Sequence, residues 1–290
     1  NSKLEVASGD RVTVFYDDPK GDWGDALQVR DEALYAATVI KGSTIVKDVE
    51  WIKEESPYLI TGDVTIQSGR SLTIKEGVKV IFLANSDDTE GGEEKYDSEL
   101  LVEGSISVLG TAAEPVTFTS SETAPTKGDW GGIKHKQTGV FEYAILEYSG
   151  YGIYVLNADL TVKNSKIRNS GTYGIRGDSL NGKLILVEDS EITGTQSDAI
   201  QLRDGYQNSS FTIKRNKISD SSGGGISLGY VGEVVFEGNE IKNNQNATFN
   251  LWGMYGDISF KDNAFKNNKG GVSIRDVYQS GISILVEGNS

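Results

Sequence analysis

The sequence has no cysteine, one histidine and only four prolines among its 290 residues. The absence of cysteine excludes disulfides, thiolate metal sites and cysteine nucleophiles. No apolar run approaches the roughly 20 residues that a membrane-spanning helix needs, and the amino terminus has no apolar signal-peptide segment. We therefore expect no membrane span, and we expect the natural protein to lose a signal sequence ahead of Asn1.

Positive charge is also scarce, since 28 Lys and Arg face 42 Asp and Glu, for a formal net charge of −14 at pH 7. Nucleic acids and anionic membrane surfaces bind clustered Lys and Arg, so this balance argues against both as partners. The acidity suits solubility or divalent cations instead. Nothing in the sequence requires a cofactor, although its acids could bind calcium.

A repeat fills the chain from Gly152 to Ser290. Each of its six rows contains two short runs that alternate apolar and polar residues, then a small polar residue, then a third apolar position. The small polar residues recur every 23 to 26 positions, at Ser165, Ser190, Asn216, Asn239, Asn263 and Asn289. A period in this range is typical of a solenoid, and two-residue alternation indicates strands. A helical array would need apolar residues at three- and four-residue steps, which these rows lack.

Two columns of charge support this stacking. If successive rows lie about 4.8 Å apart, equivalent outward residues become neighbours. The first column reads Lys163, Glu188, Lys214, Glu237, Lys261 and Glu287, and the second reads Lys166, Glu191, Lys217, Glu240 and Ala264. The sign alternates from row to row, so the predicted register places opposite charges above and below each residue.

The polar line, the Gly-Ile-x-Leu row starts and the Asn-rich turns at Asn243-Asn244 and Asn267-Asn268 resemble the right-handed parallel β-helix of the pectate-lyase-like superfamily. The segment from Trp51 to Ile133 is similar to a second pattern of secreted β-helix proteins from bacteria or archaea. The resemblance implies an all-β, single-stranded right-handed parallel β-helix of about 9–11 coils with an amino-terminal cap. It also implies a secreted or cell-surface location and asparagines stacked between the second and third strands.

The predicted organisation has two parts. Residues 1–50 lack the row pattern, and we expect an amino-terminal cap there, with a strand from Arg11 to Tyr16 and a helix from Asp25 to about Thr38. Residues 51–290 form the β-helix, interrupted by an acidic loop at 85–99. Because the last row stops before its third strand, we expect the natural protein to continue beyond Ser290.

The acidic loop is the first candidate for metal binding. A long loop inside a solenoid is usually functional or mobile, and calcium takes six to eight oxygen ligands. The candidate ligands are Asp87, Asp88, Glu90 and Asp97. A solvated, mobile excursion remains the alternative. A second acidic stretch, residues 17–25, could hold calcium, and the alternative is an ordinary polar turn. His135 lies between two lysines, where we expect alternation to point it outward, and we predict that it is inert.

In the resembling family, carbohydrate chains lie along the first strand column and its flanking turns. Here the outward residues of that column are polar, and the turns after it carry one tyrosine per row. Aromatic rings with a polar tip suit sugar stacking, although stacked tyrosines also pack well between rows. The predicted ligand contacts are Tyr154, Arg176, Gln201, Arg203, Tyr206, Tyr230, Asn250, Trp252, Tyr255, Arg275 and Tyr278.

Catalysis has weaker support. The polygalacturonase and uronate epimerase signatures of the resembling family are missing, and the only acid and base group that we can assemble is Arg176 with Asp178 and Asp204. Three hypotheses remain: a polysaccharide-binding module, a structural or adhesive surface spacer, and a lyase or hydrolase acting on uronate-containing glycans. For each we expect a monomer or a part of a larger chain.

Overall fold

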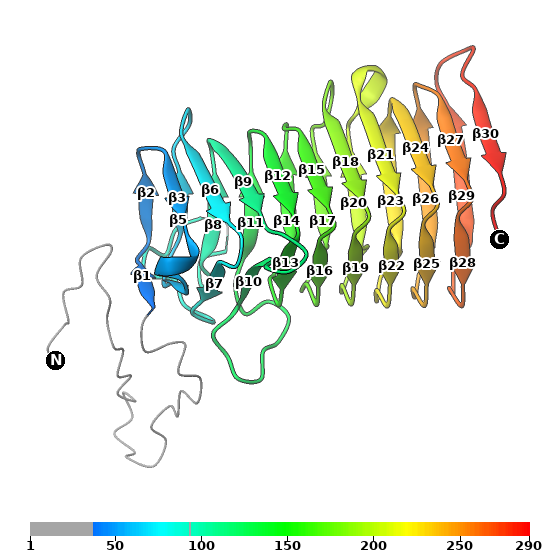
Figure 1. Ribbon diagram of the computed structural model, residues 1–290. Helices are drawn as coiled ribbons and strands as arrows, with labels where there is room; N and C mark the ends of the chain where they lie inside the picture. Colours follow the sequence, from blue (N-terminus) through cyan, green and yellow to red (C-terminus); the bar gives the residue numbers. More distant parts are fainter. Residues whose placement is uncertain (1–36, 93) are drawn as a thin grey trace, which may run out of the picture.

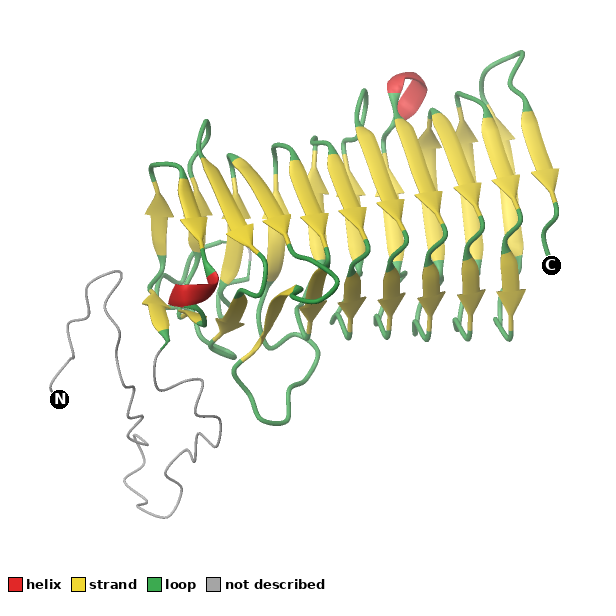
Figure 2. Ribbon diagram, in the orientation of Figure 1, coloured by secondary structure: helices red, strands yellow, loops and turns green. Residues whose placement is uncertain are grey.

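The computed structural model describes residues 37–92 and 94–290, which form a right-handed parallel β-solenoid (Figure 1). Three parallel sheets of ten strands each run along its length, so the described residues contain ten coils. Strands and loops make up nearly all of it, and the two short 3-10 helices are η2 (Lys53–Glu55) and η3 (Tyr206–Asn208) (Figure 2). The predicted fold class is confirmed.

Each coil contributes one strand to each sheet. Sheet A contains β1 (Thr38–Ile40), β4 (Tyr58–Ile60), β7 (Lys79–Phe82), β10 (Val116–Ser120), β13 (Ala144–Glu147), β16 (Lys166–Arg168), β19 (Glu191–Thr193), β22 (Lys217–Ser219), β25 (Glu240–Lys242) and β28 (Ala264–Lys266). Sheet B contains β2 (Ser43–Ile45), β5 (Val64–Ile66), β8 (Glu99–Val102), β11 (Gly132–His135), β14 (Ile153–Leu156), β17 (Ile175–Asp178), β20 (Ile200–Arg203), β23 (Ile226–Val231), β26 (Phe249–Met254) and β29 (Val272–Val277). Sheet C contains β3 (Val49–Trp51), β6 (Ser71–Lys75), β9 (Ser105–Leu109), β12 (Gly139–Glu142), β15 (Leu160–Lys163), β18 (Leu184–Glu188), β21 (Ser210–Lys214), β24 (Glu233–Glu237), β27 (Ile258–Lys261) and β30 (Ile284–Glu287).

The core is built from the inward residues of the alternating strands. In sheet C the register stacks Val187, Ile213, Phe236 and Phe260 above one another, and all four are buried. The rings of Phe236 and Phe260 are 5.2 Å apart and nearly parallel. Because every inward position meets its equivalent in the next coil, the core is one continuous apolar column, as in other solenoids.

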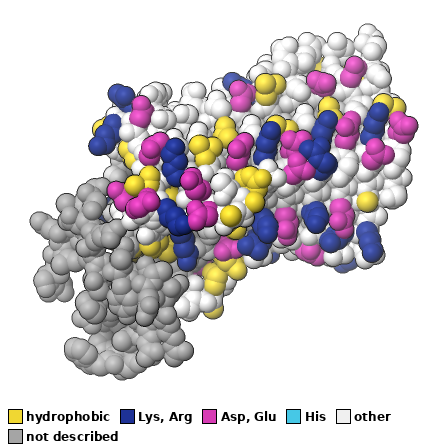
Figure 3. All heavy atoms as spheres, in the orientation of Figure 1, with side chains coloured by type: hydrophobic (Ala, Val, Ile, Leu, Met, Phe, Trp, Pro, Cys, Tyr) yellow, Lys and Arg dark blue, Asp and Glu magenta, His cyan; other side chains and the backbone are white. Residues whose placement is uncertain are grey.

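The charge columns on sheets A and C confirm the predicted register. Lys163, Glu188, Lys214, Glu237, Lys261 and Glu287 are paired in that order along sheet C. Figure 3 shows the alternation of basic and acidic side chains on this face. Lys214 Nζ lies 3.3 Å from a carboxylate oxygen of Glu237. Such exposed pairs each contribute at most about 1 kcal/mol, so their main effect is on register.

The predicted polar line forms a buried ladder in the turns between sheets C and A. The backbone N–H of Asn216 donates to Oδ1 of Asn239 at 2.9 Å, and Nδ2 of Asn239 donates to the carbonyl of Ile213 at 2.9 Å. Asn263 and Asn289 repeat this arrangement in the following coils. Each side chain thus satisfies buried backbone groups that a sharp turn leaves without strand partners.

The coils begin earlier than we expected. Strands β1 to β3 form a complete coil over residues 38–51, paired with β4 to β6 of the next coil. The strand predicted at 11–16, the acidic stretch at 17–25 and most of the helix predicted from Asp25 lie outside the described residues. Within the residues that are described, no helix is long and apolar enough to cross a membrane.

His135 corrects one prediction, because it lies inside the core instead of on the surface. The register pairs it with Val102 and Val155, which face inward. Its Nδ1 donates to the carbonyl of Gln137 at 2.7 Å, and Nε2 has no hydrogen-bond partner in the described part of the chain. Burial lowers the pKa of His135 to about 4, so the ring is neutral near pH 7. The prediction assigned the wrong phase to the alternation, because steps of two from the inward Ile133 place His135 on the inward face.

Candidate functional site

The outward column of sheet B forms as predicted. The register pairs Tyr154, Arg176, Gln201, Ser227, Asn250 and Ser273 in succession. A second outward column lies two residues further along these strands and contains Arg203, Gly229, Trp252 and Arg275. We call this surface the sheet-B face. It brings the predicted contacts of the strands onto one side of the solenoid.

The first part of the sheet-B face is built around Tyr154. Lys134 and Arg176 stand one coil before and one coil after it, with Lys134 Nζ 4.9 Å and Arg176 Cζ 5.0 Å from its ring centroid. Its hydroxyl donates to Asp178 at 3.0 Å. Cations close to an aromatic ring are attracted to it. Tyr154 is therefore held by its neighbours, and sugar stacking on this ring would compete with those contacts.

Two of the three catalytic candidates are bound to each other. Nε of Arg176 donates to Oδ2 of Asp178 at 2.8 Å. Burial opposes protonation of Arg176, but the charge and hydrogen bond of Asp178 outweigh it, and the pKa of Arg176 is raised. A guanidinium that stays protonated does not suit a Brønsted base. Asp204 lies in the turn after β20, and in the described residues its side chain makes no hydrogen bond or ion pair with Arg176 or Asp178.

The four predicted tyrosines come together from four successive coils, with Tyr230 inside β23 and the other three in the turns that follow sheet B. We call Tyr206, Tyr230, Tyr255 and Tyr278 the tyrosine cluster. Ring centroids are 5.7 Å apart for Tyr206 and Tyr230, 5.5 Å for Tyr255 and Tyr278, and 6.4 Å for Tyr230 and Tyr278. The exposed fractions of Tyr206, Tyr230 and Tyr278 are 40%, 36% and 58%. The cluster is therefore one continuous aromatic surface that remains open to solvent.

Glycines set the position of the aromatic side chains beside this cluster. A Cβ on Gly229 would lie 2.4 Å from Cζ2 of Trp252, so the indole occupies the space above that glycine. Similarly, a Cβ on Gly253 would lie 2.9 Å from Cδ1 of Tyr230. Gly253 also has φ near +73°, which glycine adopts without strain. The two glycines therefore let aromatic rings lie close against the strands.

Two predicted contacts of the sheet-B face contain buried polar atoms. Gln201 is only 4% exposed, and its Oε1 has no hydrogen-bond partner in the described residues, nor has Nε of Arg203 in the same strand. A buried polar atom without a partner costs about 1–3 kcal/mol. Gln201 thus forms part of the floor of this face and presents little surface to a ligand, whereas Asn250 and Arg275 are more open.

The acidic loop lies against the turns of the first coils, and its carboxylates act largely as hydrogen-bond acceptors. Asp88 accepts the N–H of Gly42 at 3.0 Å and the hydroxyl of Thr61 at 2.7 Å. Asp87 accepts the N–H groups of Thr89 and Gly91 at 3.0 and 2.9 Å. Residues 37–92 and 94–290 contain no group of three or more acidic or histidine side chains arranged to hold a metal ion. The four predicted ligands are thus not gathered around one point.

Burial, hydrogen bonds and neighbouring charges shift the pKa values of three acids in and beside this loop. Burial, and then the charge of Asp87, raises the pKa of Asp63, although the N–H of Glu99 opposes the shift. Burial and the charges of Glu94 and Asp129 raise the pKa of Asp97. For Asp87, hydrogen bonds from Thr89 and Gly91 outweigh burial and lower the pKa.

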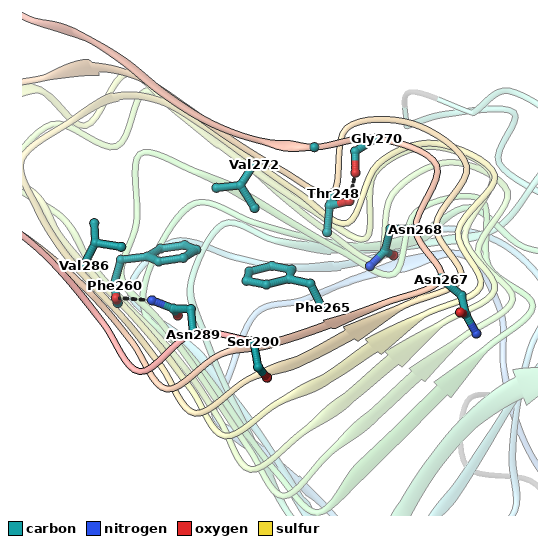
Figure 4. A pocket seen from close by; sticks show the side chains of 11 residues that line it. Thr248, Phe260, Phe265, Asn267, Asn268, Gly270, Val272, Val286, Asn289 and Ser290 are labelled. Carbon is teal, nitrogen blue, oxygen red and sulfur yellow. Dashed lines mark hydrogen bonds between the residues drawn. The ribbon is translucent and has the colours of Figure 1, made fainter.

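A cavity of about 470 Å³ opens at the last coil (Figure 4). Phe260 and Phe265 face it from the core with ring centroids 5.8 Å apart, and Asn289 donates to the carbonyl of Phe260 at 2.9 Å. Its lining combines these core rings and two valines with small polar residues, and the amides of Asn268 and Asn289 are bonded to the backbone. This arrangement leaves few groups to recognise a ligand.

Sequence reasoning missed three residues around Tyr154 and Arg176. Tyr151 stacks against Tyr154 with ring centroids 6.0 Å apart, Lys134 lies over the ring of Tyr154, and the ring of Tyr173 lies 5.5 Å from Cζ of Arg176. Tyr151 and Tyr173 each stand directly before a Gly-Ile row start. Aligning the residues that precede each row would have placed both beside the column.

Ten stacked coils, an internal asparagine ladder and a polar, aromatic sheet-B face define a right-handed parallel β-helix protein. The chain belongs to the right handed beta helix region family, whose model matches residues 131–290, more than half of the sequence. Residues 43–139 match the pectate-lyase like beta helix domain. A comparison with curated protein sequences found no match.

Several solved structures are similar to this chain. One is a double mutant of the periplasmic alginate epimerase AlgG, with 13% identity and a TM-score of 0.40 over 87% of this chain and 76% of that chain. Another is the catalytic domain of GH87 alpha-1,3-glucanase in complex with nigerose, with 12% identity and a TM-score of 0.36 over 88% and 64% of the two chains. The Dettilon tailspike protein shows 12% identity and a TM-score of 0.31 over 87% and 64%.

Proposed function

We propose that this protein is a secreted or cell-surface module that binds polysaccharide through the tyrosine cluster and the adjoining part of the sheet-B face. The observation that carries the proposal is the contact of four tyrosines from successive coils in one solvent-open surface. Aromatic rings lose little conformational entropy on binding and offer an apolar face with a polar hydroxyl. Both properties suit sugar rings, which have apolar faces and polar edges.

Neighbouring residues add polar groups to this surface. Trp252 extends the aromatic area along β26, and Asn250 and Arg275 stand beside it in the two outward columns. Because the coils repeat at about 4.8 Å, such groups follow one another along the axis and suit a chain of repeating units. No catalytic step is part of the proposal, since the ion pair between Arg176 and Asp178 occupies the candidate acid and base.

Affinity electrophoresis in gels that contain soluble neutral or uronate polysaccharides tests the proposal. We expect at least one polymer to retard the protein. Each of Tyr230→Ala and Tyr255→Ala should weaken binding roughly 2- to 10-fold, because one aromatic contact contributes about 0.5–1.5 kcal/mol.

Tyr96→Ala is the matched control, since Tyr96 is an exposed tyrosine on the acidic loop. It should leave retardation unchanged. If no polymer retards the protein, or if Tyr96→Ala weakens binding as much as the cluster variants do, the binding proposal is wrong, and the cluster then has a structural role in packing successive coils.

A further inference from the structure

A buried carboxylate without a partner lies where the acidic loop meets the second coil. Asp63, in the turn between β4 and β5, is only 6% exposed. Its Oδ1 accepts the N–H of Glu99 at 2.8 Å, but Oδ2 has no hydrogen-bond partner in the described residues. The hydroxyl of Thr89 lies nearby but already donates its hydrogen to Asp87 at 2.6 Å. A buried carboxylate oxygen of this kind is costly unless a proton or a cation compensates it.

A second carboxylate oxygen lies beside it, at a point where the loop has no side chain. A Cβ on Gly92 would be 2.1 Å from Oε2 of Glu99 and 2.7 Å from Oδ2 of Asp63. The two oxygens are therefore no more than about 4.8 Å apart, a separation that one calcium ion can bridge with calcium–oxygen bonds of roughly 2.3–2.6 Å. A Cβ on Gly91 would also lie 3.0 Å from Asp63 Oδ2 and 3.4 Å from Thr89 Oγ1. The two glycines thus let the loop backbone lie close to three side-chain oxygens, of which Glu99 Oε2 also accepts the N–H of Glu94 at 3.2 Å.

We propose that Asp63 and Glu99 bind one calcium ion, which fastens the acidic loop to the second coil. Thr89 Oγ1, backbone carbonyls and water would complete its shell, because calcium accepts six to eight oxygens in an irregular arrangement. Two carboxylates suffice for such a site. The proposed ligands therefore differ from Asp87, Asp88, Glu90 and Asp97, the four acids that the sequence suggested.

The location explains why calcium suits this site better than magnesium. Magnesium requires near-ideal octahedral geometry and gives up its water reluctantly. Asp63 and Glu99 belong to different coils, and Thr89 to the loop between β7 and β8, so the oxygens come from three separate segments. Calcium tolerates unequal metal–oxygen distances, so it suits oxygens that come from separate segments.

Calcium titration of the EDTA-treated full chain tests this proposal. We expect calorimetry to find one bound ion, and the urea midpoint of unfolding to rise with calcium and much less with magnesium. Asp63→Asn should lower calcium affinity about tenfold or more, because a charge-assisted contact is lost. Glu99→Gln is a second variant with the same expected result, should Asp63→Asn fail to fold.

Glu90→Gln is the control, because it removes one charge from the same loop at an exposed position paired with Lys95. It should bind calcium as the unchanged protein does. The proposal is overturned if calcium neither binds nor moves the midpoint, or if all three variants lose affinity equally. It is also overturned if Asp63→Asn raises the midpoint equally in EDTA and in calcium, since the buried carboxyl would then hold a proton.

Discussion

At the scale of single residues, burial decides how this protein responds to pH. His135 is enclosed by the core, and only one of its two ring nitrogens has a hydrogen-bond partner in the described residues. Protonation would place a charge beside Phe141, whose ring centroid is 6.3 Å away. Burial therefore disfavours the charged form, and its pKa falls to about 4 from an ordinary value of 6.5.

This shift predicts acid sensitivity. The folded pKa of His135 lies below the unfolded pKa, so the unfolded chain binds the proton more tightly between pH 6.5 and 4. The stability that depends on neutral His135 is fully present above pH 6.5 and is lost as the pH falls towards 4. The loss is on the order of 3 kcal/mol.

Urea unfolding of the wild type and of His135→Leu across this pH range measures the effect, since the variant should lack this part of the pH dependence. Equal slopes for the two proteins would contradict the assignment. The comparison between the two proteins also removes contributions from the other titrating groups.

The positions of single side chains could be predicted from the sequence within strands but less well in turns. Residues within strands, such as Arg176 and Asn250, could be placed because alternation and period define their columns. His135 was misplaced because the prediction took the wrong phase of the alternation, whereas steps of two from the inward Ile133 place it inside. Tyr151 and Tyr173 lie in turns, where alternation does not apply, but both precede a Gly-Ile row start, so the period alone could have placed them beside the column.

At the scale of elements, the turns between sheets C and A depend on their asparagines. Asn239 both accepts and donates within its ladder. It accepts the N–H of Asn216 at 2.9 Å and donates to the carbonyl of Ile213 at 2.9 Å. Both backbone groups are buried away from bulk water. The side chain is therefore needed to satisfy two groups at once.

We predict that Asn239→Ala lowers the free energy of unfolding by about 3 kcal/mol, because two buried backbone groups lose their partners. Asn246→Ala serves as the control, since Asn246 is exposed in a turn. It should change the free energy of unfolding by less than about 0.5 kcal/mol. Similar losses for the two variants, measured by urea denaturation, would show that the ladder does not contribute in this way.

The position of the acidic loop could be predicted from the sequence, but its conformation could not. Its position and length follow from the break in the row pattern, and its acid content suggested a cation. Its conformation depends on contacts that no local rule provides, such as the N–H of Gly42 donating to Asp88 46 residues away. For the same reason the pair of oxygens from Asp63 and Glu99 could not be predicted, since Asp63 lies outside the loop and only the fold brings it next to Glu99.

At the scale of the whole molecule, every surface described above depends on one relation. Residues about two dozen positions apart lie side by side in successive coils, which produces the core, the ladder and the charge columns. The tyrosine cluster follows from the same relation, because its four rings come from four consecutive coils. The period and the alternating charges predicted this arrangement without any coordinates, because stacking in register requires both.

Engineered disulfides test this relation directly, because the chain has no cysteine of its own. Thr212 and Val235 are paired outward residues of β21 and β24, and Ser259 follows in the next coil. Neighbouring strands lie about 4.8 Å apart, within the Cα separation that a disulfide spans, whereas two coils lie about 10 Å apart and exceed it.

The decisive measurement is the number of free thiols after mild oxidation, read by alkylation and mass spectrometry. The variant with Thr212→Cys and Val235→Cys should lose both thiols and unfold at a higher temperature than its reduced form. The variant with Thr212→Cys and Ser259→Cys should keep both thiols as a monomer. Equal oxidation of the two variants, or oxidation of the second one alone, would contradict the stacking of the coils.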